Sequence, residues 1–183
     1  MKKITELLTK QIKFKNNLIA ATTILMLSFT AINTVEASPT LHKTLKVQNQ
    51  DIFYREAGTE HKETIVLLHG FPTSSHMYRN LIPKLSEKYH VIAPDYPGFG
   101  NSSMPSLDEF EYSFDNLAKI TNAFLEQANV EEYTLYVMDY GAPIGFRIAA
   151  KHPERIKRLI IQNGNAYDEG LRFLEANQSL LER

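Results

Sequence analysis

The sequence predicts an α/β fold, a doubly wound and mostly parallel sheet that is entered through an N-terminal antiparallel hairpin. Four short apolar runs lack the polar alternation of a half-exposed strand, which is typical of strands covered on both faces of a parallel sheet. These runs are residues 64–68, 91–93, 133–137 and 159–161. Helical patterns separate them, and in such sheets ligands bind beyond the carboxyl ends of the strands.

The hairpin and the crossover helices follow from local periodicity. Residues 41–48 and 51–56 alternate on either side of the polar pair Asn49-Gln50, which predicts two antiparallel strands. Apolar side chains recur at helical spacing over 75–88 and again over 113–128, so each segment is predicted to be an amphipathic helix. A third helix is expected over 142–151.

Composition excludes several classes of function. The 183 residues are 43% apolar, and 20 basic residues nearly balance 21 acidic ones, giving a net charge of −1. This balance provides no basic surface for nucleic acid or for an anionic membrane. The absence of cysteine excludes disulfides, thiolate metal sites and a cysteine nucleophile. No glycine-rich phosphate loop follows the first parallel strand, and we expect neither a metal nor a cofactor.

The N-terminal segment has the order of a secretory signal. Five lysines within the first 15 residues precede an apolar run over 18–32, and Val35 and Ala37 supply small residues for a peptidase. We therefore expect residues 1–37 to be a signal peptide, the mature chain to begin at Ser38, and the protein to be periplasmic or secreted. An uncleaved anchor is the alternative, although a membrane-spanning helix needs about 20 apolar residues. After cleavage no stable membrane anchor is expected.

Three strand ends carry the chemistry. The first parallel strand leads directly into the segment 69–72, His-Gly-Phe-Pro, in which Gly70 would permit a tight turn. The second leads into a Pro/Gly-rich loop over 95–102, which we interpret as structural. The third leads into the segment 137–141, Val-Met-Asp-Tyr-Gly, at the start of a helix.

Asp139 stands at the centre of that third segment. A sharp turn from a strand into a helix is the setting of a nucleophile elbow, which raises one side chain above the sheet. Serine is the usual central residue, but a carboxylate can also attack carbon and form an ester that water hydrolyses. The simpler alternative is that Asp139 only caps the helix, since Asp is a favoured N-cap residue.

Taken together, segments 69–72, 95–102 and 137–141 resemble the α/β-hydrolase superfamily, and within it the epoxide hydrolases and haloalkane dehalogenases. The resemblance covers roughly residues 41–170. It implies that Asp139 is the nucleophile and that the backbone amides of Phe71 and Tyr140 form the oxyanion hole. It also implies a small apolar organic substrate and a helical cap that begins near Asn165.

The two subfamilies differ at the same positions. Haloalkane dehalogenases hold halide with an Asn and a Trp at the positions of Phe71 and Tyr140, and neither N–H donor is present here. By contrast, Val137 and the segments 72–75 and 79–80 are more similar to dehalogenases. Epoxide hydrolases usually have Gly and His at the positions of Val137 and Met138. We favour the epoxide hydrolase interpretation, with the dehalogenase as the alternative.

No general base or acid partner is predicted within this chain. In this fold the acid and then the histidine follow the nucleophile, and His152 is the only downstream histidine. It lies 13 residues further along a helix, on the order of 20 Å away. We therefore expect a hydrolase core over 38–164, the start of a cap over 165–183, and a chain that is shortened and inactive in turnover. A non-catalytic binding module on the same fold is the remaining alternative.

Overall fold

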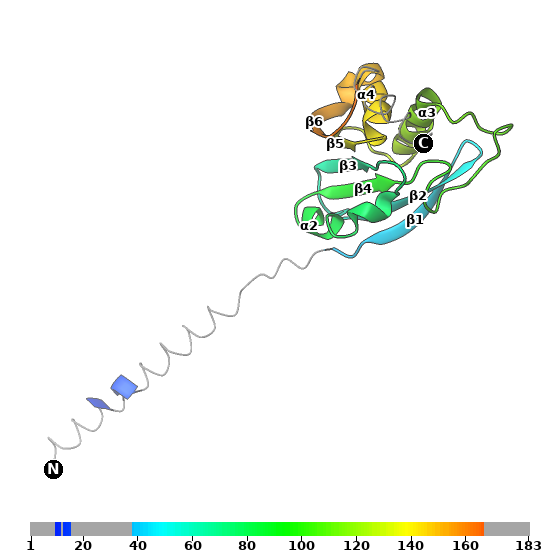
Figure 1. Cartoon of the computed structure of the whole chain (residues 1–183). Coiled ribbons are helices and arrows are strands. Elements are labelled where there is room, and N and C mark those ends of the chain that lie inside the picture. The colour runs from blue at the N-terminus through cyan, green and yellow to red at the C-terminus, as the bar shows by residue number, and fades with distance from the viewer. Residues whose placement is uncertain (1–9, 12, 16–37, 167–183) are drawn as a thin grey trace, which may run out of the picture. The chain divides into compact units, whose positions relative to one another are not determined.

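The computed structural model describes residues 10, 11, 13–15 and 38–166 (Figure 1). Residues 10, 11 and 13–15 are helical and belong to a compact unit separate from the one that begins at Ala37. Most of the predicted signal peptide, 1–37, lies outside the described residues. The same holds for all but the first two residues of the predicted cap segment, 165–183.

A six-stranded mixed sheet forms the core of the protein. Its strands are β1 Leu41–Val47, β2 Gln50–Ala57, β3 Thr64–Leu68, β4 His90–Pro94, β5 Tyr133–Met138 and β6 Ile156–Gln162. They lie in the order β1-β2-β4-β3-β5-β6. The hairpin pairs antiparallel with itself and with β4, and all other pairs are parallel. The predicted fold class is therefore confirmed.

The order of the strands creates a switch point in the sheet. The chain runs from β3 to β4 on one side and then crosses to β5 on the other side of β3. In sheets of this class, ligands bind in a crevice at the carboxyl ends of the strands where the winding changes direction. The segments that follow β3 and β5 therefore meet at the carboxyl ends of the strands, where ligands bind in this class of sheet.

The helices are η1 Ser75–Tyr78, α2 Ile82–Ser86, α3 Phe114–Gln127, α4 Gly141–Lys151 and η2 Pro153–Arg155. Those predicted over 113–128 and 142–151 are present within one residue of their expected ends. The single helix predicted over 75–88 is wrong, because it is divided into η1 and α2. Pro83 lies in the first turn of α2, where its missing N–H and its ring are tolerated, whereas inside a continuous helix they would not be.

Two apolar layers cover the sheet. Residues from α3 and α4, among them Phe124 and Ile144, pack against Leu68 on one face. On the other face Tyr78 and Ile82 pack against residues that include Leu67. Alternate side chains of β3 thus enter opposite layers and both are buried, which explains why its sequence shows no alternation. Burying each such side chain contributes about 1.5–3 kcal/mol.

The edge strand β6 departs from this pattern. Leu159, Ile160 and Ile161 are 40%, 45% and 53% exposed, although their sequence is as apolar as that of a covered strand. Within residues 38–166 no strand pairs with the outer edge of β6. Among the described residues, the apolar side chains of 159–161 are therefore only partly covered, unlike those of β3.

Candidate active site

The candidate site is built where β3 and β5 end side by side. The two strands are parallel neighbours, with Leu68 opposite Val137 in the register. Consequently the segments that follow them, which the sequence separates by almost 70 residues, leave the sheet at the same edge. Gly141 permits close contact here, because a Cβ at this position would lie 2.4 Å from the carbonyl oxygen of Leu68.

Asp139 lies on the sharp turn between β5 and α4. Its φ of 47° falls in the left-handed region, which is uncommon for residues other than glycine. The turn is held on both sides, since the Asp139 amide donates to the carbonyl of Asn163 at 3.3 Å and its carbonyl accepts from Ala142 at 3.0 Å. A strained backbone held this firmly is common at functional sites.

Two backbone amides converge on one oxygen of the Asp139 carboxylate. Oδ1 accepts a hydrogen bond from the Phe71 amide at 2.8 Å and another from the Tyr140 amide at 2.6 Å. These are the two amides that the sequence suggested for an oxyanion hole. Among the described residues no hydrogen bond reaches Oδ2.

The geometry does not fit a simple helix cap. An N-cap side chain bonds to amides two or three residues ahead of it. Here the N-cap position of α4 is Tyr140, which makes no side-chain capping bond, and the Asp139 carboxylate instead bonds the next amide and a distant loop. The carboxylate is therefore oriented by two separate segments of the chain.

Gly70 begins the predicted tight turn and also lies against the nucleophile. The turn is confirmed, since the Gly70 carbonyl oxygen accepts from the Thr73 amide at 3.1 Å across residues 71 and 72. A Cβ at Gly70 would lie 2.7 Å from the Cβ and 2.9 Å from Oδ1 of Asp139. The missing side chain thus makes room for the carboxylate.

Four aromatic rings, which we call the aromatic rim, lie together around Tyr140, the residue after Asp139: Phe71, Phe99, Phe114 and Tyr140. The Tyr140 ring lies 4.8 Å from the Phe114 centroid, 5.4 Å from that of Phe71 and 6.2 Å from that of Phe99. Phe71 is 59% and Tyr140 37% exposed. Apart from the Tyr140 hydroxyl, the rim side chains offer no hydrogen-bonding group.

Two buried polar side chains support the loops around the site. Asp95 accepts hydrogen bonds from the amides of Ser75 at 2.6 Å and Asn101 at 2.9 Å, which agrees with the predicted structural role of its loop. His69 is fully buried, its ring lies 4.2 Å from that of Tyr96, and its Nδ1 lies 3.0 Å from the Gly70 carbonyl oxygen. Burial lowers the pKa of His69, which favours the neutral imidazole.

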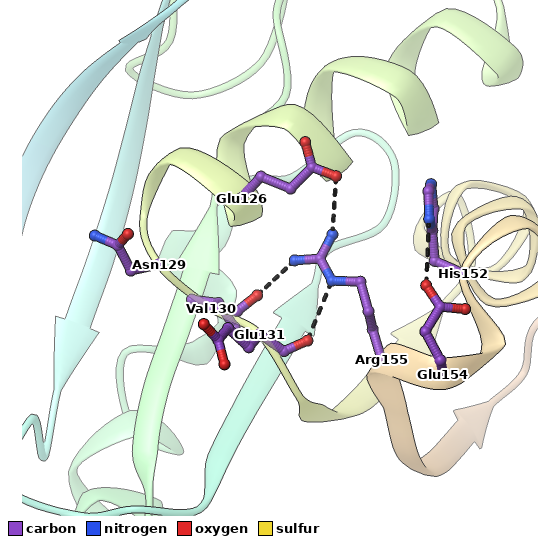
Figure 2. A pocket seen from close by; sticks show the side chains of 7 residues that line it. All are labelled: Glu126, Asn129, Val130, Glu131, His152, Glu154 and Arg155. Atoms are coloured by element: carbon purple, nitrogen blue, oxygen red, sulfur yellow. Dashed lines mark hydrogen bonds and ion pairs between the residues drawn. The ribbon is translucent and has the colours of Figure 1, made fainter.

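His152 lies at the opposite edge of the sheet, at the C-terminal end of α4. There it helps to line a hollow of about 350 Å³, together with Glu126, Asn129, Val130, Glu131, Glu154 and Arg155 (Figure 2). The Arg155 guanidinium crosses this region and donates to the carbonyl oxygens of Val130 at 2.5 Å and Glu131 at 3.1 Å. These bonds connect Arg155, just before β6, to the loop before β5. Their role is structural, and they lie far from the turn that carries Asp139.

Residues 38–166 contain no group of three His, Cys, Asp or Glu side chains arranged to hold a metal ion. In the part of the chain that the structure describes, no helix has the length and apolar content needed to cross a membrane. The groups hydrogen-bonded to the Asp139 carboxylate there are backbone amides alone.

A doubly wound sheet of this order, with a strand-to-helix elbow at its switch point, is the architecture of the α/β-hydrolase fold. The chain belongs to the alpha/beta hydrolase fold family, whose model matches residues 63–182.

Similar proteins place the chain within the family. It is 50% identical over 129 residues to the uncharacterized hydrolase YNR064C of Saccharomyces cerevisiae, covering 69% of this chain and 44% of that one. Haloalkane dehalogenase 1 of Mycobacterium tuberculosis is 46% identical over 101 residues, which are 55% of this chain and 33% of that enzyme. The structure of the epoxide hydrolase CorEH superposes with a TM-score of 0.62 at 28% identity, over 67% of this chain and 42% of that one. The chain thus spans less than half the length of these relatives.

Proposed function

We propose that the protein is an epoxide hydrolase-like enzyme in which Asp139 attacks carbon. The observation that carries this proposal is the asymmetry of the carboxylate: two amides hold Oδ1, whereas Oδ2 accepts no hydrogen bond from the described residues. Oδ2 is therefore the nucleophilic oxygen, and Oδ1 becomes the carbonyl oxygen of an ester. Because the amides already point at Oδ1, they also stabilise the negative charge that forms there when water attacks the ester.

The reaction balances without a cofactor. Oδ2 forms a bond to an epoxide carbon, the ring C–O bond breaks, and the ring oxygen takes a proton from the solvent to become a hydroxyl. Water then attacks the ester carbon and the Cγ–Oδ2 bond breaks. One proton of this water goes to Oδ2 and the other returns to the solvent, so that a diol leaves and the carboxylate re-forms.

The substrate proposed is a small, apolar organic molecule, because Phe71 and Tyr140, whose amides hold Oδ1, carry exposed aromatic rings, and the Tyr140 ring also packs against Phe114. An epoxide is favoured over a haloalkane, since the side chains of Phe71 and Tyr140 contain no N–H to hold a leaving halide. Haloalkane hydrolysis is the second candidate, supported by the 46% identity to a haloalkane dehalogenase. A non-catalytic binding module on this fold is the third.

Turnover is a separate matter from alkylation. Within residues 38–166 no histidine contacts the Asp139 carboxylate, and a positioned base typically contributes 10² to 10⁴-fold to the rate. We propose that the 183-residue chain is alkylated once and releases product slowly or not at all.

Intact mass spectrometry after incubation with styrene oxide or 1-iodohexane tests the nucleophile. The epoxide adduct retains every atom of the reagent, whereas the iodoalkane adds only its alkyl group, so the two chemistries are distinguishable by mass. We expect a single adduct on Asp139, with styrene oxide the faster reagent, and none in Asp139→Asn. Asp108→Asn, in an exposed loop, is the matched control and should react normally. An unmodified Asp139 in folded protein would contradict the proposal.

We also propose that the protein is exported and cleaved after Ala37. N-terminal sequencing of material recovered outside the cytoplasm should begin at Ser38. Recovery of chains that still carry Met1 would contradict cleavage.

A further inference from the structure

The peptide group between Gly70 and Phe71 is held at both of its polar atoms. Its N–H donates to Oδ1 of Asp139 at 2.8 Å. Three groups lie within hydrogen-bonding distance of its carbonyl oxygen: Nδ1 of His69 at 3.0 Å, the amide of Thr73 at 3.1 Å and Oγ1 of Thr73 at 2.9 Å.

A trans peptide is planar, and its C=O and N–H point in opposite directions. Fixing the direction of the Gly70 carbonyl therefore fixes the direction of the Phe71 N–H. If the carbonyl were released, rotation of this peptide would turn the N–H away from the carboxylate and could bring the carbonyl oxygen towards it. The groups that donate to the Gly70 carbonyl therefore affect the direction of the Phe71 N–H, because the peptide plane that joins the two is rigid.

His69 is suited to this task by its protonation and its burial. Nδ1 must carry the proton in order to donate to a carbonyl, and burial keeps the imidazole neutral by lowering its pKa. With the proton on Nδ1, the neutral ring has its lone pair at Nε2, which finds no partner among the described residues. Packing against Tyr96 and Phe99 fixes the ring plane, so the Nδ1–H has one direction.

We propose that His69 and Thr73 are positioning residues that aim the Phe71 amide at the nucleophile by holding the opposite end of the same peptide group. This inference rests on the proposed role of Asp139, because it assigns their effect to the oxygen that becomes the ester carbonyl. The second amide, that of Tyr140, belongs to the elbow and the start of α4 and does not depend on them. The two halves of the oxyanion hole are therefore held separately.

Amide NMR of protein labelled with ¹⁵N-Phe and ¹⁵N-Tyr tests the proposal without relying on activity. Asp139→Asn gives the reference proton shifts of both amides without the carboxylate charge. Thr73→Val removes the hydroxyl donor but keeps the backbone donor, and Thr73→Ser restores a hydroxyl. We expect the Phe71 amide to move towards the reference in Thr73→Val and to return in Thr73→Ser, while the Tyr140 amide stays in place.

His69→Leu should move the Phe71 amide in the same direction. His69 is buried, so this variant could fail to fold. Thr73 is exposed, and the comparison of Thr73→Val with Thr73→Ser therefore tests the proposal independently. A Phe71 amide that does not move in folded Thr73→Val would overturn the proposal. If the shifts move as expected but Asp139 is never alkylated in the wild type, the proposed function fails and the positioning role stands.

Discussion

The backbone amide of Phe71 lies 2.8 Å from Oδ1 of Asp139, a residue 68 positions further along the chain. This contact joins the loop after β3 to the elbow after β5, the two segments that meet at the switch point of the sheet. It also requires that the residue before Phe71, Gly70, has no side chain.

Gly70→Ala should disturb the carboxylate directly, because the new Cβ would lie 2.7 Å from the Cβ of Asp139. We expect a loss of about 1–3 kcal/mol in the free energy of unfolding from overpacking, and at least a roughly tenfold slower alkylation of Asp139. Gly145→Ala is the matched control, since its Cβ would meet a Val137 methyl at 2.4 Å, away from the carboxylate. Equal alkylation rates in the folded fractions of both variants would argue against a special role for Gly70.

His69 should make the stability of the protein depend on pH below neutrality. Burial lowers the pKa of His69 from its ordinary value of 6.5, so the unfolded chain binds a proton more readily than the folded one. The contribution of the neutral ring is therefore fully present above pH 6.5 and decreases as the pH falls from there towards the folded pKa. Urea titrations between pH 5 and 8 should show this slope in the wild type and a flatter profile in His69→Leu. His152→Gln should keep the wild-type slope.

Glu56 should also make the stability of the protein decrease in acid, in a lower pH range than His69. Its carboxylate accepts from Nε2 of His90 at 2.8 Å and from Nζ of Lys43 at 2.5 Å, joining β1, β2 and β4. Burial raises the pKa of Glu56, but the hydrogen bonds from Lys43 and His90 outweigh it and the net shift is downward from 4.5. This stabilisation is therefore present above pH 4.5 and is lost as the pH falls through the lower folded value.

Glu56→Gln should accordingly lower the free energy of unfolding by about 1–3 kcal/mol at pH 7, the usual effect of losing a hydrogen bond to a charged group. The difference from the wild type should shrink in acid. Glu87→Gln, at an exposed position, serves as the control and should change little. A constant difference between pH 3 and pH 7 would show that the charge of Glu56 is unimportant.

The exposed apolar side chains of β6 should cause the chain to self-associate, because an unpaired apolar edge strand is a template for pairing. Ile161→Lys is expected to shift the sedimentation distribution towards monomer. Leu107→Lys removes an even more exposed side chain, 82% accessible, from a loop away from the sheet edge, and should leave the distribution unchanged. Equal effects of the two substitutions would assign the association to general hydrophobicity.

Most of the fold could be predicted from the sequence because its signals are local. The unbroken apolar runs at 64–68 and 133–137, the periodic pattern of α3 and the polar break at Asn49 each depend on neighbours within a few residues. The continuous helix predicted over 75–88 is wrong because Pro83 is tolerated near the start of a helix but not inside it. Apolar periodicity alone does not include this local signal. The apolar sequence of β6 is like that of a covered strand, yet its side chains are partly exposed among the described residues, because coverage depends on neighbouring segments that local sequence does not specify.

By itself, the sequence determined the fold class, the strand-to-helix setting of Asp139 and the pair of amides suggested for the oxyanion hole. Only the tertiary structure decided that both amides point at one oxygen, that Gly70 leaves space for the Asp139 carboxylate as well as beginning a turn, and that Nδ1 of His69 lies 3.0 Å from the Gly70 carbonyl oxygen. The reason is physical: chain order and side-chain chemistry are written along the sequence, whereas the direction of a peptide group and the space beside a side chain arise only when β3 and β5 lie together.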